Sequence, residues 1–301
     1  MDLTKRLVVF SALMGAALLL QSCSSNAATS IADDNSASGA IAGVLGGAVS
    51  GSSATGTQEH LVPISALVSH ASCPTMKTAN GSGCTQSGSI FTMTYADCSF
   101  GSAAATWTGS QVVTLASGSA SCGTFPTTTF TRTFGAGTTR TNKSAVVVTL
   151  DTSTNTSNFE SDSLGGGTTV TFSSNLRTAI NINGIRLTSN IFDHTIYTSS
   201  PLAFTGDATT TKTLNGTIVL LHNLLKVRAT TTVSDVEFTA SCCYPTGGSL
   251  STLFDAGTSG GDGSSKYVGK TETLTFGTTC GQATYVGIEG STATVNLTNC
   301  F

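Results

Sequence analysis

The stretch Ile90-Phe-Thr-Met-Thr-Tyr95 alternates large apolar side chains with threonines. Successive side chains of a β-strand point to opposite faces of the sheet, so this alternation is typical of a strand with one buried and one polar face. The same period of two recurs at Thr168-Thr-Val-Thr-Phe172 and at Thr292-Ala-Thr-Val-Asn-Leu297. Threonine is the polar residue that best suits a half-buried, pleated surface. These segments predict a sheet whose exposed face carries hydroxyl groups.

Further segments rich in Val, Ile, Thr and aromatic residues extend this pattern over residues 111–115, 127–134, 145–150, 217–221, 226–233, 236–240 and 267–276. Asn183-Gly184 separates two alternating arms and is the strongest hairpin signal in the chain. Short turns between consecutive strands predict antiparallel pairing. We expect a mostly β fold: antiparallel sheets that form a sandwich or a partial barrel, with one or two short N-terminal helices.

Three short segments each place an apolar residue two positions before a glycine that leads into a predicted strand. They are Trp107-Thr-Gly109, Ile182-Asn-Gly184 and Leu214-Asn-Gly216. Two interpretations stay open. The glycines mark equivalent strand ends in a repeated hairpin, or they are kinks where long strands bend.

The composition agrees with a β-rich protein and excludes several classes. Of the 301 residues, 54 are threonine and 40 are serine, and only 10% are charged, against about 25% in an average soluble domain. Few Glu, Lys and Arg residues are available for helix surfaces, which argues against a mainly helical protein. The net charge of −3 offers no broad cationic face, which argues against nucleic acid as a partner.

The N-terminal segment has the features of an export signal. Lys5 and Arg6 precede the apolar residues 7–20, a stretch shorter than the roughly 20 residues that span a bilayer. The stretch ends at Leu20-Gln21-Ser22-Cys23, which resembles the lipobox of bacterial lipoproteins, the site of signal peptidase II. The resemblance implies that residues 1–22 are a lipoprotein signal peptide and that Cys23 becomes the lipidated N-terminus.

This resemblance also implies a location, although it covers only about 20 residues and leaves the body of the chain without a named family. Ser24, rather than Asp, follows the lipidated position, which by analogy with lipoprotein sorting implies the outer membrane. Acyl chains such as palmitate would anchor the protein there, facing the periplasm or the cell surface. The expected partners are therefore the membrane and an envelope or surface protein. The alternative is an ordinary cleaved signal peptide with a coincidental cysteine.

The remaining cysteines suit an exported protein. Eight of them form an even set that allows up to four disulfides in an oxidising periplasm. Pairing within the group 73–122 and within the group 242–300 is the simplest arrangement, and no C-x2-C spacing favours zinc. The disulfide candidates are Cys73, Cys84, Cys98, Cys122, Cys242, Cys243, Cys280 and Cys300.

The chain divides into an anchor, a tether and a body. Residues 23–58 are rich in Ser, Gly and Ala and predict a tether, within which glycines recur every fourth residue over 39–51, as in a glycine zipper. That segment is either a short helix or plain linker. Residues 61–70 have helical spacing of apolar residues. Residues 59–301 predict a disulfide-stapled β domain, single or divided near 152–167.

No catalytic, cofactor or metal site is expected from the sequence. The neighbours Asp193 and His194 would point to opposite faces of a strand, which argues against a shared catalytic role. The Gly-rich loop 255–263 lacks the EF-hand pattern, which leaves only a weak calcium site as an alternative. We expect a noncatalytic outer-membrane lipoprotein with a binding, adhesion or structural role in the cell envelope. One alternative is a periplasmic β module that carries lipid or another hydrophobic ligand in an aromatic-lined cavity; a hydrolase is a third.

Overall fold

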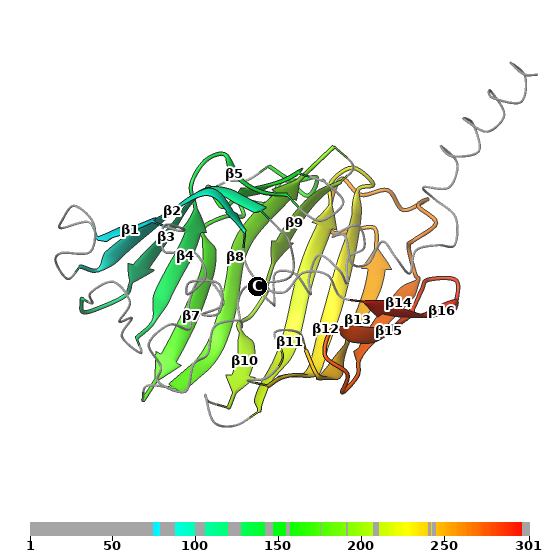
Figure 1. The fold of residues 1–301 in the computed structure, drawn as a ribbon. Helices are drawn as coiled ribbons and strands as arrows, with labels where there is room; N and C mark the ends of the chain where they lie inside the picture. Colours follow the sequence, from blue (N-terminus) through cyan, green and yellow to red (C-terminus); the bar gives the residue numbers. More distant parts are fainter. Residues whose placement is uncertain are drawn as a thin grey trace, which may run out of the picture.

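The computed structural model describes residues 75–78, 88–99, 106–119, 128–141, 147–154, 157–174, 176–190, 192–206, 211–239, 242 and 245–296. These residues form sixteen strands of a single sheet (Figure 1). The strands are β1 (Thr75–Thr78), β2 (Ile90–Ser99), β3 (Thr106–Leu115), β4 (Phe130–Phe134), β5 (Thr138–Thr141), β6 (Val147–Asp151), β7 (Gly167–Ser173), β8 (Leu176–Thr188), β9 (Asp193–Tyr197), β10 (Leu202–Thr205), β11 (Lys212–His222), β12 (Val227–Phe238), β13 (Gly247–Asp255), β14 (Thr271–Phe276), β15 (Gln282–Val286) and β16 (Thr292–Asn296).

The prediction of a mostly β, antiparallel fold is confirmed, since neighbouring strands of this sheet pair antiparallel, as in the long ladders of β11 with β12 and of β12 with β13. The predicted N-terminal helices, the tether and the lipobox all lie outside the described residues. Within the described part of the chain, no helix is long and apolar enough to cross a membrane.

The period of two in the sequence becomes a difference between the two faces of the sheet. In β12, Val227, Ala229 and Val233 are buried on one face, here called the inner face, whereas Thr230 and Thr232 lie on the other, the outer face. The inner face carries a large apolar cluster that extends from β6 to β16 and a second cluster on β2, β3, β4 and β7. Trp107 packs against both clusters, so the apolar core continues from one end of the sheet to the other.

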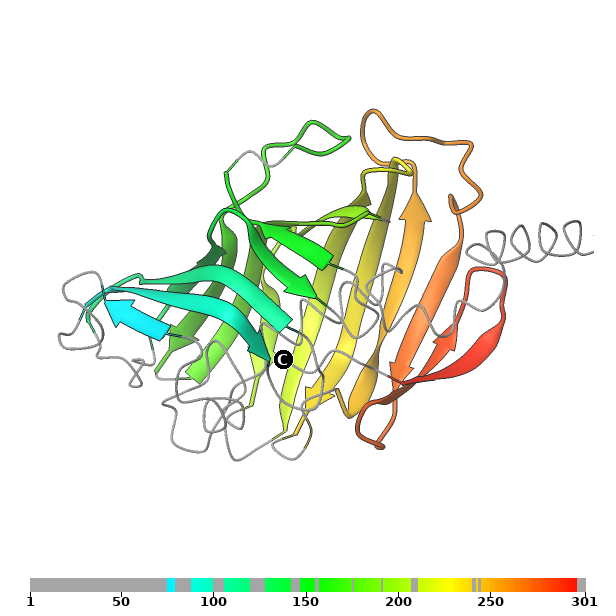
Figure 2. The same cartoon turned by 45° about the horizontal axis from the view of Figure 1, so that its top comes forward.

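Six strands close into a ring of hydrogen-bonded pairs. From β3 one path runs through β4 and β7 to β8, and another runs through β5 and β6 to the same strand β8. Figure 2 shows the green β5–β6 hairpin standing in front of the longer strands. The ring is the part of the molecule that corresponds to the expected partial barrel, and β9 to β16 continue from it as an open, curved sheet.

The three glycines singled out in the sequence lie inside long strands, where each strand changes its partner. β3 pairs with β5 before Gly109 and with β4 after it. β8 pairs with β7 up to Gly184 and with β6 and β9 beyond it. β11 pairs with β10 before Gly216 and with β9 after it. Of the two interpretations, the kink within a long strand is therefore the one that the structure shows.

The hairpin predicted at Asn183-Gly184 is consequently wrong, because β8 continues through both residues. Gly184 adopts a φ of 156°, and a Cβ atom there would lie 2.3 Å from the backbone nitrogen of Gly165. Only glycine lets the chain pass so close to the strand at this point. Gly184 was correctly identified as a break in the alternation. The chain does not reverse at this break; instead, the segment that contains Gly165 packs closely against the strand.

β9 and β10 together fill the space between β8 and β11. Both strands pair with both of these neighbours, β9 toward one end and β10 toward the other. Thr198, just after β9, accepts a hydrogen bond from the Ile182 backbone N–H at 3.0 Å and donates one from Oγ1 to Asn181 Oδ1 at 2.7 Å. These bonds hold the end of β9 in place against β8.

A disulfide joins Cys242, which follows β12, to Cys280 between β14 and β15, with the two Cα atoms 5.6 Å apart. Both cysteines belong to the C-terminal group of the sequence, and the bond spans 38 residues. Cys98 also forms a disulfide. The disulfide between Cys242 and Cys280 ties the last strands to the end of β12 and restricts the freedom of the unfolded chain.

Candidate functional site

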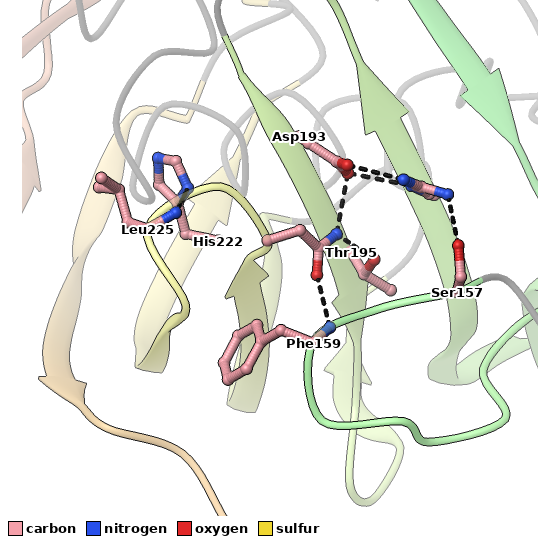
Figure 3. Close-up of polar contacts among 8 residues, drawn as sticks. Ser157, Phe159, Asp193, Thr195, His222 and Leu225 are labelled. Carbon is pink, nitrogen blue, oxygen red and sulfur yellow. Dashed lines mark hydrogen bonds and ion pairs between the residues drawn. The ribbon is translucent and has the colours of Figure 1, made fainter. Parts of the chain in front are cut away.

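A polar cluster lies on the outer face, near the ends of β8 and β11 and the beginning of β9 (Figure 3). Arg186 of β8 donates from Nε to Asp193 Oδ1 at 3.0 Å and from Nη2 to Asp193 Oδ2 at 2.7 Å. Two parallel hydrogen bonds of this kind fix both the distance and the orientation of the two side chains. The pair therefore holds β8 and β9 together beside the turn that joins them.

Asn223, in the turn after β11, extends this pair into a network. Its Nδ2 donates to Asp193 Oδ1 at 2.8 Å and to Thr195 Oγ1 at 3.0 Å. Its Oδ1 accepts a hydrogen bond from the backbone N–H of Phe159 at 3.1 Å. One amide thus joins β9, the β11–β12 turn and the segment that precedes β7, as Figure 3 shows.

That segment, residues 157–166, crosses the outer face and is fastened at several points. Ser157 Oγ accepts from Arg186 Nη1 at 2.8 Å. The Glu160 side chain is 1% exposed, and its Oε1 accepts from the backbone N–H of Thr258 at 2.7 Å. Arg228 Nη1 lies 3.8 Å from the same oxygen. The segment covers the outer side of β9, which explains why Thr195 is buried there although it faces away from the core.

Asp193 and Arg186 are both held in their ionised forms. Burial alone would raise the pKa of Asp193, but hydrogen bonds from Arg186 and Asn223 outweigh it and hold that pKa below its usual range. The hydrogen bond to Asp193 raises the pKa of Arg186 in turn. A carboxylate held ionised by two donors is a poor general acid or base near neutral pH, so the arrangement acts as a clamp.

The inner face beneath Asp193 has the opposite character. His194 is fully buried; its ring stacks on Phe192 with centroids 4.8 Å apart and meets the ring of His222 edge-on at 4.6 Å. His194 and His222 are direct partners in the β9–β11 ladder. His222 Nδ1 accepts a hydrogen bond from the backbone N–H of Leu225 at 3.3 Å, whereas neither ring nitrogen of His194 has a hydrogen-bond partner.

Both imidazoles are held neutral. Burial lowers the pKa of His194 to about 3, with a further contribution from the neighbouring His222. Burial likewise lowers the pKa of His222. Because Nδ1 of His222 accepts a hydrogen bond, its proton resides on Nε2. The two imidazoles therefore pack as neutral aromatic rings. Both are titratable, and protonation of either ring would disturb this packing.

The sequence placed Asp193 and His194 on opposite faces of one strand, and the structure shows that arrangement. It did not single out Arg186, Asn223 or Glu160. The spacing of seven residues between Arg186 and Asp193 across a hairpin is the one signal that could have paired them. Asn223 lies 30 residues from Asp193 and Glu160 lies 98 from Thr258, distances at which sequence carries no contact information.

Several residues named from the sequence lie outside the described residues. They are Cys23, Cys73, Cys84, Cys122, Cys243 and Cys300. Across the described residues, no group of three or more His, Cys, Asp or Glu side chains could hold a metal ion. The carboxylates of loop 255–263 accept hydrogen bonds within the loop instead: Asp255 from the Gly257 N–H at 2.6 Å, and Asp262 from Ser264 Oγ at 2.6 Å.

A second feature of the outer face is a surface rich in hydroxyl groups on β13 to β16, here called the hydroxyl face. Strand register places Ser249, Thr275, Thr284 and Thr294 in one row across four strands. The neighbouring row contains Ser251, Thr273 and Thr292, with Val286 of β15 between the two threonines. The outward positions of β14, β15 and β16 carry no ionisable side chain. This surface can exchange many hydrogen bonds with a partner without desolvating a charge.

No protein-family model matches the chain, and neither the curated proteins nor the solved structures contain a match.

Proposed function

We propose that the protein is a noncatalytic outer-membrane lipoprotein, anchored through Cys23, which binds a component of the cell envelope through its hydroxyl face. The observation that carries the proposal is the in-register arrangement of exposed hydroxyl groups on β13 to β16. Such rows offer both donors and acceptors at the regular spacing of the sheet. A repeated, uncharged polar ligand is the partner that this spacing suits.

The polar cluster around Asp193 supports a structural interpretation. Its donors and acceptors form hydrogen bonds with one another and with the 157–166 segment. The cluster is therefore a rigid part of the same sheet that carries the hydroxyl face. A disulfide between Cys242 and Cys280, beyond the other ends of β12 and β14, adds to that rigidity. Rigid surfaces lose little conformational entropy on binding.

The anchor is tested by mass spectrometry of the mature protein isolated from membranes. An acylated N-terminal Cys23 is expected, and the Cys23→Ser variant should leave the membrane fraction. An unmodified N-terminus in the wild type would overturn the anchor.

The binding surface is tested by co-purification with envelope fragments. The double variant Thr273→Glu/Thr284→Glu places two carboxylates on the hydroxyl face and should reduce retention at least tenfold, while Lys266→Glu, outside the face, should leave it unchanged. Equal retention of all three proteins would refute binding through this surface. Protease treatment of intact cells then separates the two sides of the membrane, because only a surface-exposed protein is degraded.

A further inference from the structure

The two ends of the sheet differ in their protection against pairing. In the described residues the order of strands ends at β1 on one side and at β16 on the other. The sequence of β1 contains Lys77, and lysine on an edge strand is a common device against edge-to-edge association. The sequence of β16, Thr-Ala-Thr-Val-Asn, contains no charged residue and no proline.

β16 is also regular. All five of its residues pair in unbroken register with β15, from Thr292 opposite Val286 to Asn296 opposite Gln282. A bulge that would twist the edge away from a partner is therefore missing from this ladder. β16 thus presents a straight row of backbone donors and acceptors at the outer edge of the described sheet.

The side chains of β16 are self-complementary about Thr294. If a second copy of β16 added antiparallel with Thr294 at the centre, Thr294 would face Thr294 of the other copy, and Ala293 would face Val295. Thr294 is exposed on the hydroxyl face, while Val295 is 2% exposed on the inner side. Hydroxyl would meet hydroxyl and apolar would meet apolar, with no charge in the contact. A two-fold axis normal to the sheet satisfies this pairing, as isologous dimers require.

The geometry points to a homodimer in which β16 of two copies pair antiparallel around Thr294 and join the two sheets into one. The row Thr275–Thr284–Thr294 then continues into the same row of the partner in reverse order. The hydroxyl face doubles in width without interruption. This inference goes beyond the proposed function, because the pairing depends on the strand edge and not on the anchor or on any envelope ligand.

Cross-linking of the purified full-length protein in detergent tests the register directly. Opposite residues of an antiparallel pair have Cβ atoms about 4.5–5.5 Å apart, so Thr294→Cys should form a disulfide-linked dimer on mild oxidation. The matched control is Thr284→Cys, equally exposed and one strand further in. Its two copies would be about 14 Å apart at a strand spacing of about 4.8 Å and should give only the background of the wild type.

Light scattering on the same preparations supplies a second readout. The wild type should show twice the protomer mass, and Thr294→Lys should reduce it to the protomer mass, because two lysines would then face each other across the axis. Thr284→Lys should keep the dimer. A monomeric wild type would overturn the proposal, and so would a dimer that survives Thr294→Lys. Cross-linking of Thr294→Cys in cells to a different protein, without the homodimer, would overturn it in favour of another partner strand. Loss of envelope retention with an intact dimer would count against the proposed function alone.

Discussion

Strand β9 directs Asp193 and Thr195 to the outer face of the sheet and His194 and Ile196 to the inner face. Both sides are largely buried, the first beneath the 157–166 segment and the second in the core. On the outer side, each polar group of Asp193 and Thr195 meets a donor from Arg186 or Asn223. On the inner side, the nitrogens of His194 meet none. Hydrogen-bond partners therefore keep Asp193 ionised in spite of its burial, whereas burial among aromatic rings keeps His194 neutral.

The largest effect is expected from removing apolar volume on the inner side. Ile196 is fully buried, and Ile196→Ala should lower the free energy of unfolding by about 3 kcal/mol, through lost burial and the cavity left behind. Urea denaturation measures it. Thr230→Ala, on the outer face of β12, should change that free energy by no more than about 0.5 kcal/mol. Equal effects of the two variants would contradict the assignment of the faces.

The clamp on the outer side should contribute somewhat less. Asp193→Ala leaves Arg186 without its bidentate partner, and we expect a loss of about 2 kcal/mol, between the values for exposed and fully buried pairs. The control is Glu289→Ala in the exposed pair of Lys270 and Glu289, whose charged atoms are 3.9 Å apart; it should cost less than about 0.5 kcal/mol. A double-mutant cycle of Arg186→Leu and Asp193→Leu measures the interaction. If the two single variants together lose as much free energy of unfolding as the double variant, the pair does not interact.

Lowering the pH should reduce the stability of the protein through His194 on the inner face. The pKa of His194 falls from its ordinary 6.5 to about 3 in the folded protein, so the unfolded chain binds a proton that the folded chain excludes. Stability is therefore full above about pH 6.5 and decreases as the pH falls below that value, by about 1.4 kcal/mol at pH 5.5 from this residue alone. Urea titrations at pH 7.5 and 5.5 measure the difference.

A variant without the imidazole should lose most of that pH dependence. His194→Phe keeps a ring against Phe192 and removes the titratable group, whereas Ile196→Leu, a neighbouring control, should retain the wild-type slope. Asp193 on the outer face affects stability in a different pH range. Because its pKa is lowered in the folded protein, the stability that its carboxylate contributes is lost only when the pH falls below the ordinary pKa of 3.8. An unchanged slope in His194→Phe would rule out His194 as the source.

The smallest difference is expected between hydroxyl pairs on the two faces. Thr231 and Thr252 are buried on the inner face with their Oγ1 atoms 2.7 Å apart, so Thr231→Val should cost about 1 kcal/mol. Thr131 and Thr169 form a similar pair at 3.1 Å on the partly exposed outer face. Thr131→Val should cost less than about 0.5 kcal/mol there, since water can replace the lost partner. Thermal denaturation of the two variants side by side provides the comparison.

The alternation of apolar residues with threonine predicted many of the strands and their faces, but it did not single out β5, β9, β10, β13 or β15. Phe91–Tyr95 and the segment around Val227–Val233 have the predicted burial, because alternation is a local property that any sheet uses in the same way. The same reasoning failed at Asn183-Gly184, where the dipeptide marks a strand that changes partners. Whether a glycine turns the chain or admits a neighbour depends on which segments lie beside it, and these come from elsewhere in the sequence.

The candidate site shows the same division. The opposite directions of Asp193 and His194 follow from the strand alone, because consecutive side chains alternate whatever the partner strands are. The contacts of Asn223 and Glu160 arise only from tertiary structure, since they unite residues that are separated by 30 and 98 positions. The ring formed by β3 to β8 also depends on it, because the ring closes through pairing of β3 with β5, of β4 with β7 and of β6 with β8. The sequence by itself was enough to predict the mostly β class and the two chemically distinct faces of the sheet, and it carries the expectation of an export signal that resembles that of lipoproteins. The order of the strands, the clamp on β9 and the open edge at β16 were decided by long-range hydrogen bonding and packing, for which local residue patterns carry no information.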